Sequence, residues 1–342
     1  MLFRKLMEKI IRHEDLTEQE CGEALEAIFT GETDPATVAG FLAALAVKGE
    51  SASELTGAAR VLRRNMQRIQ TPASLTVDTC GTGGDGADTF NISTTAAFVV
   101  AGCGAVVAKH GNRSVSSKCG SADVLETLGV RLDIPAEAVE EALFEINIGF
   151  LFAPNFHAAV RHAGPARKAL GIRTLFNAIG PMANPAAASC QVIGVFKPEL
   201  TESMGQALLD LGTRKAFVVH GHDGLDEISV CAPTRVTEAA DGRLKTYDLY
   251  PEIYFGEPAD PEDLKGGDAT ENAAITRAVL SGEKGAKRNI VLINSAAALV
   301  ACDKAKDIKD GIKLAGEAID SGAAMAKLEA LIQFTQEASG GR

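Results

Sequence analysis

An apolar run that ends in a glycine-rich segment constrains the fold of this chain most strongly. Residues 75–79 have the composition of a buried strand, and Gly81, Gly83, Gly84 and Gly86 follow at once. Further apolar runs, alternating with stretches of helical spacing, lie at 105–109, 191–195, 216–220 and 289–294. Buried strands that alternate with helices are typical of parallel sheets. The predicted fold class is therefore α/β, with a mainly parallel central sheet.

The residues before this sheet have a different pattern, in which apolar positions recur every three or four residues, as in a helix. Helix-start signals accompany them: Thr17 with Glu20, Ser51 with Glu54, and an Asp-Pro pair at 34–35. The pattern changes at 71–72. We therefore expect a small helical domain over 1–72 and a larger α/β domain over 73–342.

Composition excludes several classes of protein. The chain is 46% hydrophobic and 23% charged, without an apolar run long enough to span a bilayer. Its N-terminus lacks the apolar block of a signal peptide, so a cytoplasmic protein that does not bind membranes is predicted. The seven cysteines are scattered and never form a C-x-x-C pair, which favours reduced thiols and argues against a structural zinc. A net charge of −11 argues against nonspecific nucleic-acid binding.

One segment departs from this acidic composition. Acids outnumber bases 45 to 34 over the whole chain, yet no Asp or Glu occurs from Thr89 to Ala122. The same segment contains Lys109, Arg113 and Lys118. An ordinary solvated surface of so acidic a protein should carry acids. The segment therefore predicts a site for a multiply charged anion, because Lys offers a point charge and Arg a bidentate fork.

Three local features indicate phosphate groups as that anion. The glycines at 81–86 let backbone amides approach an anion, although a plain tight turn would need them equally. Residues 91–94 stand just before an apolar helix, and Gly120 with Ser121 opens another. A helix start presents free N–H groups and partial positive charge, although Ser and Thr there also serve as simple caps. Taken together, the three features predict more than one phosphate.

An acidic pair, Asp226 and Glu227, follows the predicted strand at 216–220. In isolation the pair reads more readily as solvated turn residues. Beside a polyphosphate site it suits Mg²⁺, which binds one or two carboxylates together with substrate oxygens. The residues alone thus predict a magnesium-linked site for a polyphosphorylated ligand.

These motifs, in this order, resemble the anthranilate phosphoribosyltransferase family of the nucleoside-phosphorylase-like class. The resemblance covers nearly the whole chain and includes residues 81–85, 91–94, 109–117, 120–126, 165–174, 180–181, 184–185 and 226–227. Departures are minor: Met182 and Ala183 stand where members often have Leu and a polar residue, and Cys119 where many have Ser. The resemblance implies transfer of the phosphoribosyl group of phosphoribosyl pyrophosphate to the amine of anthranilate in tryptophan biosynthesis.

The resemblance also implies roles for particular residues. Lys109, Asn112 and Arg167 are the expected catalytic residues, and Mg²⁺ would bind through Ser93, Asp226 and Glu227. Gly81, Asn112 and Arg167 would hold anthranilate, with His110 and His157 lining its approach. The expected donor-binding residues are Gly81, Gly84, Asp85, Thr89, Asn91, Ile92, Ser93, Thr94, Lys109, His110, Gly111, Asn112, Arg113, Ser114, Val115, Ser116, Ser117 and Ser121.

The family further implies a homodimer formed through the helical domain, to which a later segment at about 174–186 contributes. Two alternatives remain at this stage. A pyrimidine nucleoside phosphorylase has the same fold class but needs one phosphate and no acidic metal pair, so Asp226, Glu227 and residues 91–94 count against it. A non-catalytic relative that binds nucleic acid should have a broad basic surface, which the net charge of −11 disfavours.

Overall fold

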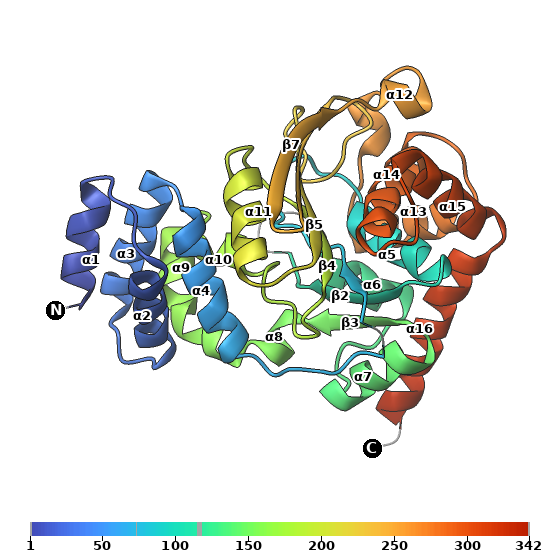
Figure 1. Cartoon of the computed structure of the whole chain (residues 1–342). Helices are drawn as coiled ribbons and strands as arrows, with labels where there is room; N and C mark the ends of the chain where they lie inside the picture. The colour runs from blue at the N-terminus through green and yellow to red at the C-terminus, as the bar shows by residue number, and fades with distance from the viewer. Residues whose placement is uncertain (1, 73, 115–117, 341–342) are drawn as a thin grey trace.

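The structure is a computed structural model that describes residues 2–72, 74–114 and 118–340. Figure 1 shows a helical unit at one end, a twisted sheet in the middle and a group of helices at the other end. Among the residues described, no helix is long and apolar enough to cross a membrane.

The N-terminal residues form a helical unit, as predicted. Its helices are α1 (Leu2–Ile11), α2 (Glu18–Phe29), α3 (Pro35–Lys48) and α4 (Ala52–Arg64). Thr17 with Glu20 and Ser51 with Glu54 form capping boxes at the starts of α2 and α4. Asp34 accepts a hydrogen bond from the backbone N–H of Thr37 at the start of α3. These caps satisfy N–H groups that have no partner inside the helix, and they fix where each helix begins.

A seven-stranded sheet forms the centre, in the order β3-β2-β1-β4-β5-β6-β7. The strands are β1 (Thr76–Asp78), β2 (Val106–Gly111), β3 (Ile148–Phe152), β4 (Cys190–Gly194), β5 (Lys215–Gly221), β6 (Thr234–Ala240) and β7 (Arg243–Leu249). The first five in this order pair in parallel, and β6 and β7 are antiparallel. The predicted α/β class with a mainly parallel sheet is confirmed. Because the order reverses at β1, the ends of β1 and β4 border a crevice of the kind where such sheets bind ligands.

The remaining helices cover the sheet and complete the helical unit (Figure 1). They are α5 (Ile92–Gly102), α6 (Ser121–Leu128), α7 (Ala136–Glu145), α8 (Ala153–Phe156), α9 (Gly164–Leu170), α10 (Leu175–Ile179), α11 (Leu200–Asp210), α12 (Glu252–Phe255), α13 (Ala269–Leu280), α14 (Ala286–Ala301), α15 (Ile308–Asp320) and α16 (Ala323–Gly340), with the 3₁₀ helices η1 (Ala158–Ala163) and η2 (Pro261–Leu264).

Both faces of the sheet are buried, against different cores. Val192 and Phe217 belong to the core formed with α5 and α14, whereas the neighbouring Ile193 and Val218 belong to the core formed with α11 and the helical unit. Successive side chains of a strand point to opposite faces, so a strand buried on both faces reads as a continuous apolar run. This explains why the short runs in the sequence located the central strands.

The predicted strand at 289–294 is wrong, because these residues lie inside α14, which is buried along almost its whole length. A helix apolar on all sides gives the same continuous run as a buried strand, and periodicity cannot separate them. Three strands escaped the sequence prediction: β3, and the hairpin of β6 and β7 at the edge of the sheet.

Candidate active site

The glycine-rich segment leaves the end of β1 and turns sharply over the crevice. Gly83, Gly84 and Gly86 have φ of 67°, 78° and 78°, a region that residues with a Cβ rarely adopt. The backbone N–H of Thr82 donates to Gly194 O at 2.8 Å, which ties the loop to the end of β4. The sharp turn predicted from the glycines is therefore present, and the N–H of Gly83 in it donates to the Asp226 carboxylate.

Gly194, at the end of β4, packs directly against the turn that carries the acidic pair. A Cβ on Gly194 would lie 1.4 Å from the carbonyl oxygen of Asp226, so only glycine fits there. Asn294 of α14 braces the same turn, because its amide accepts from the Ile228 N–H at 2.9 Å and donates to Ile228 O at 2.9 Å. A buried polar side chain of a helix core thus positions the turn that carries Asp226 and Glu227.

Three carboxylates gather beside the glycine loop. Asp85 and Asp226 are in contact with one another, and Glu227 accepts a hydrogen bond from the Ser93 N–H at 3.1 Å. Burial, and then the charge of Asp85, raises the pKa of Asp226; burial, and then the charge of Asp226, raises the pKa of Glu227. Like charges crowded in this way favour a bound cation.

These groups suit magnesium in their chemistry. Carboxylate and hydroxyl oxygens are hard ligands of the kind that Mg²⁺ prefers. A cavity of about 10 Å³ lies between Glu227, Ser93, Thr79 and Gly81. A space of that size holds about one water molecule. The oxygen ligands and the excess of negative charge therefore both suit Mg²⁺ bound by the predicted residues Ser93, Asp226 and Glu227.

Lys109 projects from β2 into the same region. Its side chain is buried, and its ammonium donates to Thr79 O at 2.9 Å and approaches the Ser93 hydroxyl at 3.4 Å. Within the described part of the chain, no carboxylate oxygen lies within ion-pair distance of this ammonium. Its charge nevertheless acts to lower the pKa of the buried Asp78 and Glu227 carboxyls, which partly balance it. An ammonium without a direct ion pair can still bind an anionic ligand.

The next residue, His110, meets His157 from the segment between α8 and η1. Their Nε2 atoms lie 3.2 Å apart and both rings are buried. Burial lowers the pKa of His110 to about 3 and that of His157 to about 4. Both imidazoles are therefore neutral at physiological pH, and they can form hydrogen bonds to a ligand without carrying charge.

A buried network holds the ends of β1 and β2 in register at this site. The fully buried Asp78 carboxylate accepts from the His110 N–H at 3.1 Å and from the Asn184 amide at 2.7 Å. The same amide nitrogen donates to Ala108 O at 2.8 Å, and the Asn184 oxygen accepts from the Ala186 N–H. Asn184 thus joins both strands to the segment after α10.

Replacing Asn184 by Ala is expected to lower the free energy of unfolding by about 2–4 kcal/mol, because a buried carboxylate loses a hydrogen bond and a cavity forms. Urea denaturation measures the change. Asn177→Ala is a matched control, since Asn177 caps the short helix α10 with one hydrogen bond at 3.0 Å. A loss of stability at Asn184 no larger than at Asn177 would show that the network does not stabilise the strand ends.

The segment after β2 continues along the crevice toward α6. Ser121 Oγ donates to Asn112 O at 3.2 Å, and the Asn112 side chain accepts from the Arg113 N–H. Arg113 binds Glu126 and Asp123 of α6, and the Ser114 N–H also donates to Asp123. Arg113 therefore braces this segment in the structure, instead of presenting a free cation. The predicted donor residues Val115, Ser116 and Ser117 lie outside the described residues.

The residues at the start of α5 are placed differently from one another. Asn91 forms no side-chain cap; its amide donates to Cys119 O at 3.2 Å and its oxygen accepts from Asn272. Ile92 and Thr94 are both buried. Thr89 pairs in an isolated β-bridge with Lys265, a contact that the sequence did not indicate.

Two arginines, Arg167 and Arg173, come from the segment around α9. Burial lowers the pKa of Arg167, whose guanidinium lies 5.3 Å from the Phe176 ring centroid. Arg173, which the sequence analysis did not select, stacks on Phe196 at 4.5 Å and lies against the glycine loop: a Cβ on Gly84 would be 3.1 Å from its Nε. Neither forms an ion pair within the described residues. Only a cation count over 165–174 could have suggested Arg173.

Comparison with known proteins identifies the family. Residues 73–325 match the model of the glycosyl transferase family a/b domain, and residues 4–66 match that of its helical bundle domain. The anthranilate phosphoribosyltransferase of Desulfatibacillum aliphaticivorans is 59% identical over 98% of this chain and 99% of its own length. That of Desulfosudis oleivorans is 60% identical over the same shares of both chains.

The chain belongs to the anthranilate phosphoribosyltransferase family. Solved structures of this family agree with the architecture. The Thermus thermophilus enzyme superposes with a TM-score of 0.90 at 43% identity, over 96% of this chain and 99% of that one. The Saccharomyces cerevisiae enzyme in complex with PRPP and Mg superposes with a TM-score of 0.87 at 30% identity, over 98% of each chain. The predicted family, fold class and enzyme class are confirmed, and the chain is a glycosyltransferase-family enzyme.

Proposed function

We propose that the chain transfers the phosphoribosyl group of 5-phosphoribosyl 1-pyrophosphate to anthranilate, as a step of tryptophan biosynthesis. The observation that carries this proposal is the meeting of an unpaired lysine, Lys109, and three carboxylates beside one glycine loop. A magnesium-bound polyphosphate needs both kinds of group within one crevice. The family membership of the chain supports the identity of both substrates.

The donor is proposed to lie along the crevice from the glycine loop to α6. Lys109 would bind its pyrophosphate, and Ser121 at the start of α6 would meet a phosphate oxygen, since helix starts favour anions. We assign Arg113 an indirect part, because it holds this segment to α6. Arg173 joins the proposed donor residues, since its cation lies against Gly84.

Magnesium is proposed to bind through Ser93, Asp226 and Glu227, with Asp85 adjacent. When bound, Mg²⁺ would neutralise charge on the pyrophosphate as it departs. The Ser93 hydroxyl, which lies 3.4 Å from Lys109 Nζ, connects the metal residues to the lysine. The protein would thus supply carboxylates for the metal and an ammonium for the leaving group from neighbouring residues.

Anthranilate is proposed to bind between Arg167 and the neutral histidines. The guanidinium of Arg167, free of acidic partners within the described chain, would bind the carboxylate and orient the amine, while Gly81 and Asn112 complete the site. His110 and His157 would line the approach as uncharged hydrogen-bonding groups.

In the proposed reaction the amine nitrogen forms a bond to C1 of the ribose and the bond from C1 to the pyrophosphate oxygen breaks. The amine nitrogen then passes one proton to water or to the departing pyrophosphate. An aromatic amine is already neutral at physiological pH, so no general base is needed before attack. Lys109 and the backbone amides of the glycine loop would stabilise negative charge on the departing pyrophosphate, which is the largest charge change of the step.

We expect Arg167 and Arg173 to affect the KM values of different substrates. Arg167→Ala should raise the KM for anthranilate by about tenfold or more, and Arg173→Ala should raise the KM for the donor by about tenfold, since each removes one charge-assisted interaction. Steady-state kinetics with each substrate varied in turn measures both. Equal effects of either variant on both KM values would contradict the division.

Loss of anthranilate fluorescence tests the function directly. Enzyme, phosphoribosyl pyrophosphate, Mg²⁺ and anthranilate are mixed, and the fluorescence of the acceptor is followed. The proposal requires a loss that depends on all four components. An unchanged signal at micromolar enzyme, with the protein folded by circular dichroism, would refute it.

A homodimer through the helical unit is also proposed. Val47 of α3 is 82% exposed, Ile11 of α1 is 72% exposed, and Ile172 after α9 is 52% exposed. Exposed apolar residues gathered in one part of a fold favour an interface.

We further propose a cytoplasmic location, which is consistent with seven free cysteines in a biosynthetic enzyme.

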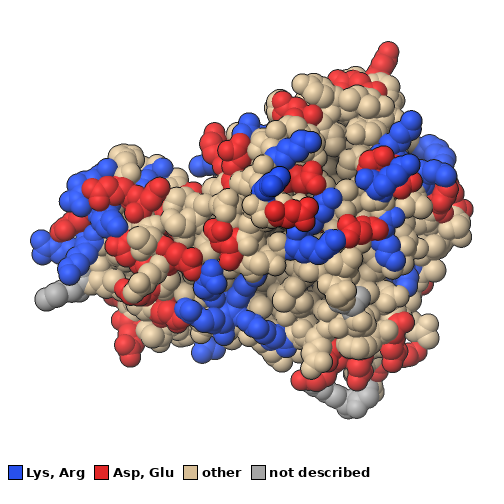
Figure 2. Space-filling model, viewed as in Figure 1, with Lys and Arg blue, Asp and Glu red and all other residues tan. Residues whose placement is uncertain are grey.

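The alternatives receive less support. Figure 2 shows acidic and basic residues interleaved over the visible face, with a basic group below its middle. That group is small compared with the continuous basic surface that nucleic-acid binding needs. A nucleoside phosphorylase would leave the three carboxylates without a role, since a single inorganic phosphate requires no metal site.

A further inference from the structure

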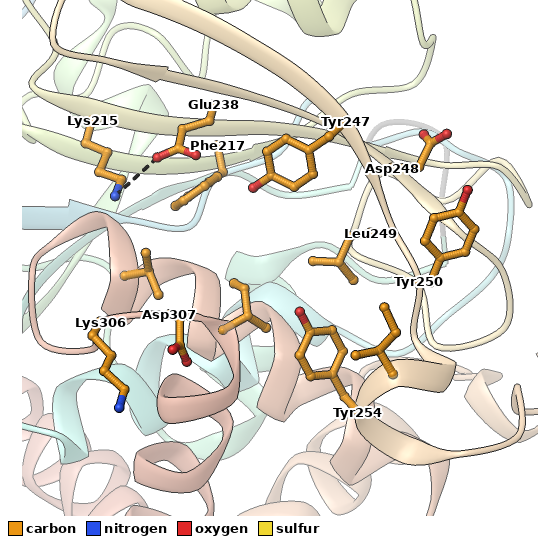
Figure 3. A pocket seen from close by; sticks show the side chains of 13 residues that line it. Lys215, Phe217, Glu238, Tyr247, Asp248, Leu249, Tyr250, Tyr254, Lys306 and Asp307 are labelled. Carbon is orange, nitrogen blue, oxygen red and sulfur yellow. Dashed lines mark ion pairs between the residues drawn. The ribbon is translucent and has the colours of Figure 1, made fainter.

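A second cavity lies against β5, β6 and β7, shares no lining residue with the cavity beside the glycine loop, and has no part in the proposed reaction. It measures about 390 Å³, within the range of small-molecule sites. Its walls come from the sheet, from α12 and from the start of α15 (Figure 3). We call it the tyrosine cleft, because Tyr247, Tyr250 and Tyr254 all line it, and these are the three tyrosines of the chain.

The three phenols are available to a ligand. None of their hydroxyls forms a hydrogen bond to another described residue. None of these three oxygens is fully buried either. Tyr247 and Tyr254 approach one another from β7 and α12 (Figure 3). Leu249 and the 73% exposed Ile253 add apolar surface beside them. The cleft therefore combines aromatic faces, apolar walls and unused polar groups.

The charges around the cleft favour a positive ligand. Lys215 is paired with Glu238 at 3.3 Å, and Lys306 extends away from the rings (Figure 3). Burial, and then the charge of Glu238, raises the pKa of Tyr247 to about 12, and burial, and then Asp307, raises the pKa of Tyr254. The lining carries one more carboxylate than ammonium group: Glu238, Asp248 and Asp307 against Lys215 and Lys306. Aromatic faces in such surroundings attract cations.

Two lysines already lie over aromatic rings that line the cleft. Lys215 Nζ lies 5.4 Å from the Phe217 centroid, and Lys245 Nζ lies 5.3 Å from the Tyr247 centroid. No cation occupies Tyr250 or Tyr254 in the same manner within the described chain. We propose that the tyrosine cleft binds a small organic ammonium ion, with Tyr250 and Tyr254 against its apolar substituents, and that this ligand steadies the segment 250–266.

The segment 250–266 joins the cleft to the donor side of the active site. Its first residues form the cleft wall, and its last residues bond to 87–90: Phe90 N–H donates to Leu264 O at 3.3 Å, and Gly266 N–H donates to Asp88 O at 2.9 Å. Lys265 Nζ adds a bond to Ala87 O. A ligand that immobilises Tyr254 should therefore also slow local opening of residues 87–90.

Choline is a suitable probe, because 3,3-dimethylbutan-1-ol is its uncharged isostere and 3,3-dimethylbutanoate is an anion of the same shape. The chain has no Trp, so its intrinsic tyrosine fluorescence arises only from this cleft. We expect a saturable fluorescence change with choline, and an affinity about tenfold or more above that of the alcohol. The anion should not bind. Absence of choline binding, or equal binding of the alcohol, would overturn the proposed ligand class.

Variants locate the site independently of fluorescence. In calorimetry with choline, Tyr254→Ala should weaken binding about tenfold, whereas Phe144→Ala, which removes a 52% exposed ring on α7, should leave it unchanged. Equal losses in both variants would place the binding elsewhere. Amide hydrogen exchange of 250–266 and 87–90 should slow with choline in the wild-type chain. Binding without slower exchange would overturn the steadying of the segment.

Discussion

Replacing Lys109 by Met is expected to lower kcat by about 10²–10³, the loss seen when one preorganised charge-stabilising group is removed from a transition state. Met keeps the length and apolar stem of Lys but has no ammonium to meet the departing pyrophosphate. The KM for anthranilate should change little, because the lysine is assigned to the leaving group. Initial rates by anthranilate fluorescence, together with circular dichroism of the variant, measure the effect.

Lys118→Met is the matched control. Lys118 comes from the same acid-free segment but is exposed and lies 3.4 Å from Asp88. Its loss should change kcat less than about twofold, since exposed ion pairs contribute little. A comparable fall in both variants would mean that the segment acts through its overall charge, and would remove the special role given to Lys109.

The double variant Asp226→Asn with Glu227→Gln is expected to separate activity from stability. Activity at millimolar Mg²⁺ should fall by about 10² or more, because the metal loses its charged ligands. The free energy of unfolding without metal should instead rise by about 1–2 kcal/mol, since crowded buried charges are removed while the shapes of the side chains are kept. Urea denaturation in EDTA and initial rates against Mg²⁺ concentration measure the two effects.

Asp241→Asn serves as the control for this pair, because Asp241 lies exposed in the turn between β6 and β7 with φ of 51°, which Asn tolerates. Neither its activity nor its stability should change. If the double variant lost stability in EDTA, the two carboxylates would be structural groups, and the magnesium assignment would fail.

Local patterns in the sequence predicted those parts of the fold that depend on a few neighbouring residues. The capping boxes at Thr17 and Ser51 formed as expected, because a cap involves residues only three apart. The strand runs located β1, β2, β4 and β5 within one or two residues. The run at 289–294 failed, because the surroundings that make α14 a buried helix come from distant segments.

The candidate active site shows the same contrast between local motifs and contacts among distant segments. Its chemistry was visible in the sequence, since the glycine loop, Lys109 and the acidic pair each lie within short motifs. Its assembly was not, because Asn294 reaches Ile228 across 66 residues and Asn184 reaches Asp78 across 106. Arg113 appeared to be a free cation in the sequence, but the fold places Glu126 and Asp123 beside it. Arg173 was overlooked, because only the fold brings it to Gly84.

In the proposed reaction the strand-end crevice couples departure of pyrophosphate to consumption of anthranilate. The most direct test is the ratio of pyrophosphate released to anthranilate consumed, measured in one reaction with Mg²⁺ present. We expect one pyrophosphate for each anthranilate, with both processes stopped by EDTA and strongly slowed in Lys109→Met. Pyrophosphate release that proceeds without loss of anthranilate, or anthranilate that remains unchanged while a nucleoside is cleaved by inorganic phosphate, would contradict it.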